Sequence, residues 1–129
     1  MAVIGLGIDL VEVARAARLM AAHEGKALVR LLTDGERAYL AERENPAPHF
    51  AVRVAAKEAV YKALQSLPNA RGVGWRDIEV VHGDEGRPSI RLHGLAEQLV
   101  AEAGRCAIHL SLTHSETSAG AVAVLERLD

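Results

Sequence analysis

The stretch at residues 53–64, RVAAKEAVYKAL, constrains the fold of this chain more than any other. Ala, Leu, Lys and Glu favour helix, and no Gly or Pro interrupts the stretch. The stretch is so apolar that most of the helix surface should be buried. It nevertheless carries four charged side chains, Arg53, Lys57, Glu58 and Lys62. The charged side chains of such a buried helix either pair with charges on neighbouring elements or belong to a functional site.

Glu58 and Lys62 are four residues apart and therefore share one face of the helix. Glu58 offers a hard oxygen ligand, and Lys62 offers a compact positive charge. Together they suit a metal-bound phosphate. The alternative is an ordinary ion pair along the helix, worth about 0.3–0.5 kcal/mol.

The length of 129 residues fits one domain, residues 1–129, with a real hydrophobic core. Half of the residues are hydrophobic and a quarter are charged, as in an ordinary globular protein. The net charge of −2 gives the molecule no field that would attract nucleic acid. We therefore expect no nucleic-acid partner, and binding of an acidic partner would need a local basic patch.

Cys106 is the only cysteine, so no disulfide can form within the chain, and a reducing compartment is expected. The first apolar run has no basic segment before it and is interrupted by Gly5, Gly7 and Asp9. We therefore expect neither a signal peptide nor a membrane span, and the cytoplasm is the expected location.

The pattern of apolar and turn residues predicts an α+β fold with hairpins rather than regular βαβ units. Strands are expected at 2–8, 78–81, 89–92, 106–112 and 119–125. Helices are expected at 11–22, 33–41 and 94–103, and the long helix should begin after a loop at 45–48 and fade by 67. The helix at 33–41 is marked by a capping box, Thr33 with Glu36.

Asp9 closes the first strand, in which Ile4, Leu6 and Ile8 alternate with glycines and Asp9. One strand face is thus apolar, and the other is bare backbone that ends in a carboxylate. Glycine in a strand often marks the close approach of a ligand or another backbone. Asp9 is either a ligand at the rim of the sheet or the cap of the next helix, with Glu12 three residues later.

The six histidines show no metal-ligand spacing, so the expected metal is a hard cation held by carboxylates and phosphates. Mg²⁺ fits because it takes only one or two protein carboxylates and keeps several waters. His114 follows a strand and is either a site residue or a solvated loop residue. Arg15 and Arg18 share a helix face that is either solvated or steers an acidic partner.

Four stretches resemble one family, the holo-acyl carrier protein synthases. GLGIDL at 5–10 is similar to that family's opening, and 53–64 resembles its R-F-A-A-K-E-A-x-x-K-A helix. The tripeptide of Gly86, Arg87 and Pro88 resembles its G-[KR]-P turn, and HLSLTH at 109–114 resembles its H-[VL]-S-[IL]-[ST]-H strand. The similarity covers nearly the whole chain in order.

The resemblance implies an enzyme, a small phosphopantetheinyl transferase with an antiparallel sheet packed on a long buried helix. It would move the 4′-phosphopantetheine arm of coenzyme A to a serine of an apo acyl carrier protein, with Mg²⁺, and release adenosine 3′,5′-bisphosphate. This reaction activates carrier proteins for fatty acid or polyketide biosynthesis. The resemblance also implies a homotrimer with active sites between neighbouring protomers.

The resemblance assigns a role to each matching position. Asp9 and Glu58 would bind Mg²⁺ and, with Lys62, form the catalytic group. The coenzyme A contacts would be Arg53, Lys62, Gly86, Arg87, Pro88 and His114, and Arg15 and Arg18 would face the acidic carrier protein. The base that takes the serine proton stays open between Glu58 and a water on the metal.

The chain departs from the family pattern at Val54, where Phe is usual, at Tyr61, and in a longer loop at 65–74. This loop would alter the fit of the pantetheine arm or the choice of carrier. Two alternatives remain: a non-catalytic module that binds coenzyme A or a carrier, and an enzyme whose client is a polyketide or peptide synthase carrier.

Overall fold

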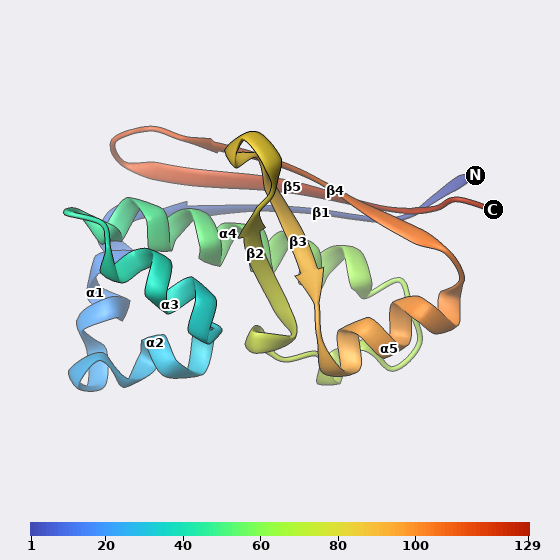
Figure 1. The fold of residues 1–129 in the computed structure, drawn as a ribbon, viewed down its shortest axis with the longest axis horizontal. Helices are drawn as coiled ribbons and strands as arrows, with labels where there is room; N and C mark the ends of the chain where they lie inside the picture. Colours follow the sequence, from blue (N-terminus) through green and yellow to red (C-terminus); the bar gives the residue numbers. More distant parts are fainter.

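Helix α4 (Pro46–Leu64) is the centre of the fold and runs along a three-stranded sheet (Figure 1). The computed structural model describes residues 1–129, except for the side chain of Asp84. The strands are β1 (Ala2–Glu12), β2 (Ile78–His82), β3 (Pro88–Leu92), β4 (Cys106–His114) and β5 (Ser118–Arg127). The other helices are α1 (Val13–Ala21), α2 (Lys26–Leu31), α3 (Asp34–Ala41) and α5 (Gly94–Ala103). Short 3₁₀ helices occupy Ala22–Gly25, Ala70–Gly72, Trp75–Asp77 and Asp84–Gly86.

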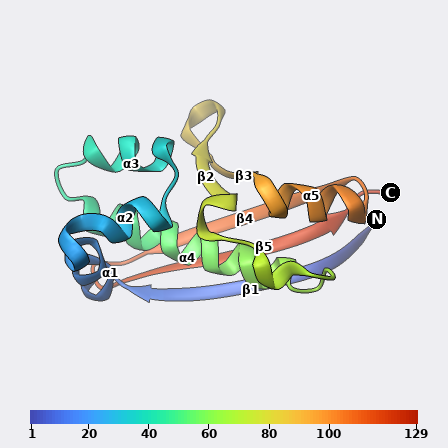
Figure 2. The same cartoon turned by 90° about the horizontal axis from the view of Figure 1, so that it is seen from below.

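The architecture confirms the α+β prediction, with an antiparallel sheet packed on a long buried helix. The main sheet has the order β1-β5-β4, and β2 and β3 form a separate hairpin. This hairpin crosses α4 near its middle and also contacts β4, while α1 packs on the helix on the side of its N-terminal part (Figures 1 and 2). The two termini lie side by side because Ala2 pairs with Arg127 across the sheet.

The glycines of β1 let the strand lie directly against α4. A methyl group at Gly7 would overlap the carbonyl oxygen of Ala59, and one at Gly5 would overlap that of Ala63. The close approach predicted for these glycines is therefore to the helix backbone. It brings Asp9, on the same strand face, to the side of α4.

The core between sheet and helix is built mainly from small and aliphatic side chains, in keeping with an aromatic content of only 3%. Ala55, Ala56 and Ala59 of α4 are fully buried, and Ala121 and Ala123 are buried on β5, which packs against this helix. The apolar face of β1 points the other way, so its aliphatic side chains are exposed. Leu6, Ile8 and Leu10 are 65%, 66% and 72% exposed.

Three boundaries differ from the sequence prediction. The first strand continues to Glu12, so Asp9 lies within β1 and does not cap α1, whose N-cap is Glu12. Helix α4 already begins at Pro46, because proline is tolerated in the first turn, where its missing N–H has no partner to lose. A short helix, α2, occupies Lys26–Leu31, where no helix was predicted.

Other elements were predicted correctly. Thr33 and Glu36 form the predicted capping box at α3, with both reciprocal hydrogen bonds present. The hairpin strands, α5 and the two C-terminal strands lie where they were expected, within two residues at each end. Among the described residues, no helix is both long enough and apolar enough to span a membrane.

Candidate active site

Asp9, Glu58 and Lys62 come together at one pocket of about 250 Å³ between β1, α1 and α4. Val54, Glu58 and Lys62 follow one another at intervals of four residues, so they form one stripe of α4 along this pocket. Asp9 enters from β1, at the position that the glycine face brings toward the helix. The strand and the helix thus supply one carboxylate each.

Lys62 bridges to the strand rather than along its own helix. Its Nζ lies 3.2 Å from Asp9 Oδ1 and donates to the carbonyl oxygen of Ile8 at 2.9 Å. Among the described side chains, Lys62 therefore forms its ion pair with Asp9. The alternative of an ion pair between Glu58 and Lys62 along the helix is not observed. The Lys62 side chain is half exposed, so its ammonium remains accessible from the pocket.

The surroundings of Glu58 disfavour its negatively charged form. Burial raises the pKa of Glu58 above its ordinary value, and the negative charge of Asp9 raises it further. The positive charges of Lys62 and Arg15 oppose this rise. Two carboxylates that repel each other beside an open pocket are a donor set that a hard cation would stabilise.

Arg15 and Arg18 are both exposed on α1, but they differ in their relation to the pocket. Arg15 lines the pocket together with Asp9 and Lys62, whereas Arg18 is not among its lining residues. Arg15 therefore belongs to the site itself as well as to the basic face of α1.

Arg53 lies in a second group of side chains, around the ring of Tyr39. Its guanidinium lies 4.1 Å from the Tyr39 ring centroid, and that of Arg43 lies at 4.2 Å. The ring of His82 stacks on Tyr39 at 4.8 Å, and His49 meets it edge-on at 5.9 Å. We call Tyr39, Arg43, His49, Arg53 and His82 the Tyr39 cluster.

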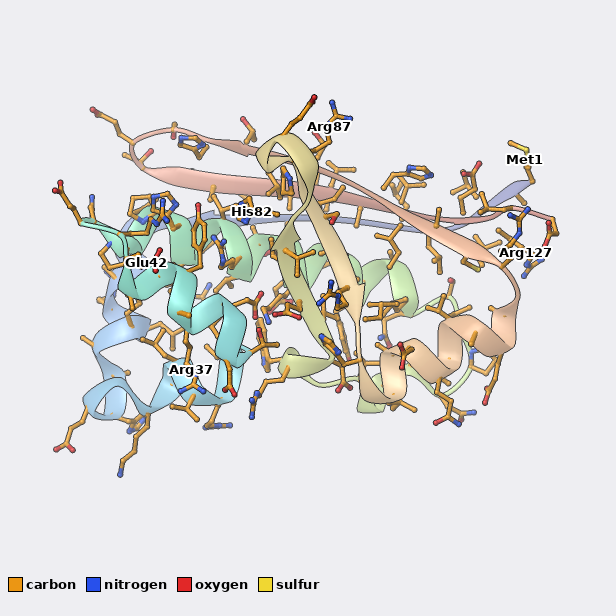
Figure 3. All side chains as sticks on the ribbon, in the orientation of Figure 1. Met1, Arg37, Glu42, His82, Arg87 and Arg127 are labelled. Carbon is orange, nitrogen blue, oxygen red and sulfur yellow. The ribbon has the colours of Figure 1, made fainter. Side chains whose placement is uncertain are left out.

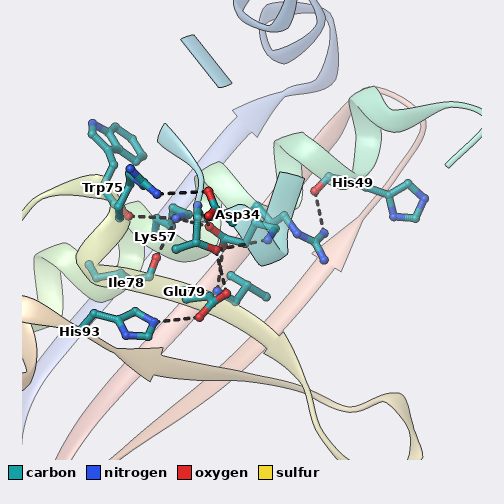
Figure 4. Close-up of polar contacts among 12 residues, drawn as sticks. Asp34, His49, Lys57, Trp75, Ile78, Glu79 and His93 are labelled. Carbon is teal, nitrogen blue, oxygen red and sulfur yellow. Dashed lines mark hydrogen bonds and ion pairs between the residues drawn. The ribbon is translucent and has the colours of Figure 1, made fainter. Parts of the chain in front are cut away.

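The Tyr39 cluster is a concentration of positive and titratable groups. Arg53 is 3% exposed and donates from Nη1 to the carbonyl oxygen of His49 at 3.1 Å (Figure 4). Its Nε is buried and has no hydrogen-bond partner among the described residues. Burial and then the charge of Arg53 lower the pKa values of His49 and His82. An anion would relieve this accumulation of positive charge.

His114 joins this group from the sheet. It ends β4 opposite Ala119, whose buried side chain points toward α4, so His114 is on the helix side of the sheet. Burial is the main cause of the lowered pKa of His49, and the charge of His114 makes a smaller contribution in the same direction. The prediction of a histidine at a strand end is confirmed, and its role stays a prediction.

Gly86, Arg87 and Pro88 lie at the tip of the β2–β3 hairpin, where Figure 3 labels Arg87, and none of them lines the pocket of Asp9. Gly86 has φ +73°, a conformation that favours glycine. The Gly83 amide donates to the Arg87 carbonyl oxygen at 2.9 Å and closes the turn. His82, at the end of β2, connects the hairpin to the Tyr39 cluster.

Lys57 is fully engaged inside the protein and takes no part in the pocket's surface charge. Its Nζ lies 2.6 Å from Glu36 Oε1 and donates to the carbonyl oxygens of Trp75 and Ile78, at 2.9 and 2.7 Å (Figure 4). Glu36 in turn accepts from the amide of Val80 at 2.8 Å. Lys57 is thus a structural link between α4, α3 and the start of β2.

Sequence reasoning did not find Tyr39, Arg43, His49 and His82, or Trp75, which lines the pocket of Asp9. One signal was available, because His49 precedes Arg53 by four residues and shares its helix face. The others come from α3, the connection between α3 and α4, β2 and a 3₁₀ turn, and only the tertiary structure brings these segments together.

The donor set can be tested against the expected metal. Among the side chains that the structure describes, no three His, Cys, Asp or Glu residues gather into a metal site. Asp9 and Glu58 therefore supply two carboxylates at most. This suits Mg²⁺, which keeps waters and takes substrate phosphates for its remaining positions.

Comparisons with known proteins show the family to which the chain belongs. The profile of the 4′-phosphopantetheinyl transferase superfamily matches residues 5–120. A holo-[acyl-carrier-protein] synthase of Alkalilimnicola ehrlichii is 45% identical over 98% of this chain and 99% of its own length. That of Rhodopirellula baltica is 44% identical over 97% of this chain and 98% of its own.

Solved structures show the same fold. The acyl carrier protein synthase of Mycobacterium tuberculosis superposes with a TM-score of 0.77 at 40% identity, over 98% of this chain and 100% of its own. The holo-(acyl-carrier-protein) synthase of Bacillus anthracis, solved in complex with CoA (3′,5′-ADP), gives 0.77 at 30% identity, with 98% of both chains covered. The chain belongs to the 4′-phosphopantetheinyl transferase superfamily and, within it, to the holo-[acyl-carrier-protein] synthases.

Proposed function

We propose that this protein transfers the 4′-phosphopantetheine arm from coenzyme A to a serine of an apo acyl carrier protein. The observation that carries the proposal is the meeting of Asp9, Glu58, Lys62 and Arg15 at one pocket. Two carboxylates and two cations there match a reaction that needs a phosphate group to be positioned and its charge neutralised. The relatives named as holo-[acyl-carrier-protein] synthases support the same reaction.

In this reaction the serine oxygen forms a bond to the β-phosphorus of coenzyme A. The bond from that phosphorus to the bridging oxygen breaks, and adenosine 3′,5′-bisphosphate leaves. Lys62 is accessible at the pocket and stabilises the negative charge that develops on the phosphates. The serine proton passes to Glu58 or to water. The raised pKa of Glu58 suits a proton acceptor better than an ordinary carboxylate would.

Asp9 and Glu58 would hold Mg²⁺, which, when bound, neutralises charge on the pyrophosphate oxygens. In the structure Lys62 forms an ion pair with Asp9, and burial, followed by the negative charge of Asp9, raises the pKa of Glu58. Both features fit a site in which an additional cation would compensate the negative charges of the two carboxylates.

The Tyr39 cluster, with His114, would bind the phosphates at the nucleotide end of coenzyme A. The unpartnered Nε of Arg53 and the lowered pKa values of His49 and His82 support an anion at this place. Gly86, Arg87 and Pro88, at the tip of the hairpin that carries His82, would lie beside the nucleotide.

The acidic carrier protein would approach along the exposed face of α1 that carries Arg15 and Arg18. Because Arg15 also lines the pocket, the carrier would be guided to the reacting phosphate. The physiological carrier belongs to fatty acid biosynthesis or to a polyketide or peptide synthase, and rates on two purified carriers would distinguish these. The single cysteine favours a cytoplasmic location.

The direct test is to incubate the purified protein with coenzyme A, Mg²⁺ and an apo carrier protein, and to weigh the carrier by mass spectrometry. One added phosphopantetheine arm is the expected result. No added mass on several apo carriers would refute the proposal. Binding of coenzyme A without transfer would instead indicate a non-catalytic binding module.

The roles of the two carboxylates can be tested separately. Asp9→Asn and Glu58→Gln should each lower the Mg²⁺-dependent rate by at least ~100-fold, the cost of removing one preorganised group at such a site. Glu12→Gln, at an exposed carboxylate of the same strand, is the matched control and should retain the wild-type rate. Full turnover in either site variant would remove that residue from the metal site.

A further inference from the structure

A second pocket adjoins the candidate active site and has no role in the function described so far. Its volume is about 210 Å³, and its walls include Tyr61 of α4 and Val73, Trp75 and Ile78 of the following segment. We call it the Tyr61 pocket. It shares Glu58 and Trp75 with the pocket of Asp9, so the two spaces meet at these side chains.

The walls of the Tyr61 pocket coincide with the places where this chain departs from its family pattern. Tyr61 is one of the positions at which the sequence departs from the pattern that it resembles, and Val73 and Gly74 end the longer loop. The Tyr61 hydroxyl donates to the carbonyl oxygen of Arg71 in that loop, at 3.2 Å. The two departures therefore contact each other and shape one cavity.

The charges around the Tyr61 pocket exclude a phosphate. The only cation in its wall is Lys57, and an ammonium has three N–H donors. All three are taken, by Glu36, the Trp75 carbonyl and the Ile78 carbonyl. The remaining wall is mainly aromatic and aliphatic, with Glu58 at the junction. Such a space takes a neutral, partly apolar group, while phosphates belong on the side of Lys62.

We propose that the Tyr61 pocket receives the thiol end of the pantetheine arm, and that Tyr61 and Trp75 limit what the thiol can carry. The inference rests on the proposed transferase function. A volume of 210 Å³ corresponds to about seven waters at about 30 Å³ each. The last amide and ethanethiol of the arm have a similar number of heavy atoms. A medium-length acyl group on the sulfur would exceed the space.

The position of Trp75 is fixed before the substrate binds. Its carbonyl oxygen is held by Lys57 at 2.9 Å, and its neighbours Gly74 and Asp77 are joined by a hydrogen bond from the Gly74 amide to Asp77 Oδ2 at 3.0 Å. Trp75 is also the only tryptophan of the chain, so its fluorescence reports the junction where the Tyr61 pocket meets the pocket of Asp9.

The first experiment compares two ligands on the wild-type protein. Coenzyme A should change the emission of Trp75, because its arm would contact the indole. Adenosine 3′,5′-bisphosphate has the same nucleotide and no arm, so it should bind and leave the emission unchanged. Calorimetry confirms that both ligands are bound. An equal change with both ligands, or none with coenzyme A, would overturn the proposal.

The second experiment measures the selectivity for the group on sulfur. Wild-type protein should use coenzyme A better than hexanoyl-coenzyme A, and Tyr61→Ala should raise the relative kcat/KM for the hexanoyl substrate by ~10-fold or more, as expected when steric exclusion is removed. Tyr61→Phe keeps the ring and removes only the hydroxyl, so it should retain the wild-type preference. An unchanged preference in Tyr61→Ala would overturn the proposal.

Different results would refute the transferase function and the role of the Tyr61 pocket. Absence of transfer from coenzyme A to any carrier would refute the transferase function, whatever the fluorescence shows. Normal transfer together with an unresponsive Trp75 and an unchanged acyl preference would refute only the Tyr61 pocket as the site of the arm.

Discussion

Lys57 and Glu58 are adjacent in the sequence and have opposite roles in the molecule. A step of one residue turns a side chain by roughly 100° around the helix, so Glu58 faces the pocket of Asp9 while Lys57 faces α3 and β2. Lys57 is 1% exposed, and burial lowers its pKa, a cost that the carboxylate of Glu36 opposes. Of the two lysines of this helix, Lys57 therefore has a structural role, and Lys62 has an accessible charge.

Replacement of Lys57 should destabilise the fold strongly. In Lys57→Met the carboxylate of Glu36 remains buried without its partner, and the loss should be about 3–5 kcal/mol of unfolding free energy. Lys57→Met combined with Glu36→Gln removes both charges and should recover most of this loss. Urea denaturation measures both variants. A single variant within about 0.5 kcal/mol of wild type would contradict a structural role for the pair.

The histidines of the Tyr39 cluster should make the free protein less stable in mild acid. Burial and the charge of Arg53, followed by Arg43, lower the pKa values of His49 and His82 below 6.5. The unfolded chain therefore takes up protons first as the pH falls through 6.5, and the folded state loses stability there. Thermal denaturation on both sides of this pH should show the loss.

The variant His49→Gln/His82→Gln should have a flatter pH dependence than wild type in the same measurement. His23→Gln, an exposed histidine outside the cluster, is the control and should keep the wild-type slope. A double variant with an unchanged slope would show that the cluster does not govern this loss.

At the scale of elements, the contact between β1 and α4 sets the geometry of the site. Gly7 lies two residues before Asp9 and directly against the Ala59 carbonyl of α4. Gly7→Ala should push the strand away from the helix, cost about 1–3 kcal/mol of unfolding free energy and separate Asp9 from Lys62. A displacement of this kind should also lower turnover by roughly 100-fold.

Gly83→Ala is a suitable control for Gly7→Ala. A methyl group at Gly83 meets only the Arg87 carbonyl oxygen, at 3.8 Å, which is an ordinary van der Waals distance. Its unfolding free energy, from denaturation, should stay close to that of wild type. If Gly7→Ala were equally well tolerated, the strand and helix would not be in the close contact described here.

The elements that carry local signals could be predicted from the sequence. The capping box of Thr33 and Glu36, the glycine after α5 and the alternation in β1 each act within a few residues. The start of α4 could not be predicted, because a loop rich in proline and a helix that opens with proline have the same local pattern. β1 extends beyond its predicted end because its pairing with β5 continues to Glu12, which lies opposite Ser118.

The candidate site was predictable to a similar degree. Asp9, Glu58 and Lys62 were expected from residue chemistry and family resemblance, and the structure brings all three to one pocket. Of the Tyr39 cluster only Arg53 was expected, because the other members come from α3, the connection to α4, α4 and β2. No local sequence pattern indicates that these elements lie side by side. The packing of the hairpin on α4 brings them together.

At the scale of the whole molecule, the outer face of the sheet is unusual for a monomer. Leu6, Ile8 and Leu10 point away from α4, and Val122 of β5 lies beside Ile8 on the same face and is 37% exposed. Contiguous exposed aliphatic side chains of this kind mark protein interfaces. We expect this face to form the protomer contacts of the homotrimer that the family resemblance implies.

Ile8→Glu tests this interface without damage to the protomer, because Ile8 is 66% exposed and outside the core. Wild-type protein should sediment as a trimer, and the variant should sediment as a folded monomer, because a buried, unpaired carboxylate opposes assembly. The variant should also lose turnover when the trimer is lost, because an active site between protomers requires a neighbouring protomer. Val29→Glu places the same charge at a 48% exposed aliphatic residue of α2 and should remain trimeric and active. A wild-type monomer with full turnover would show that the pocket of Asp9 works within one chain.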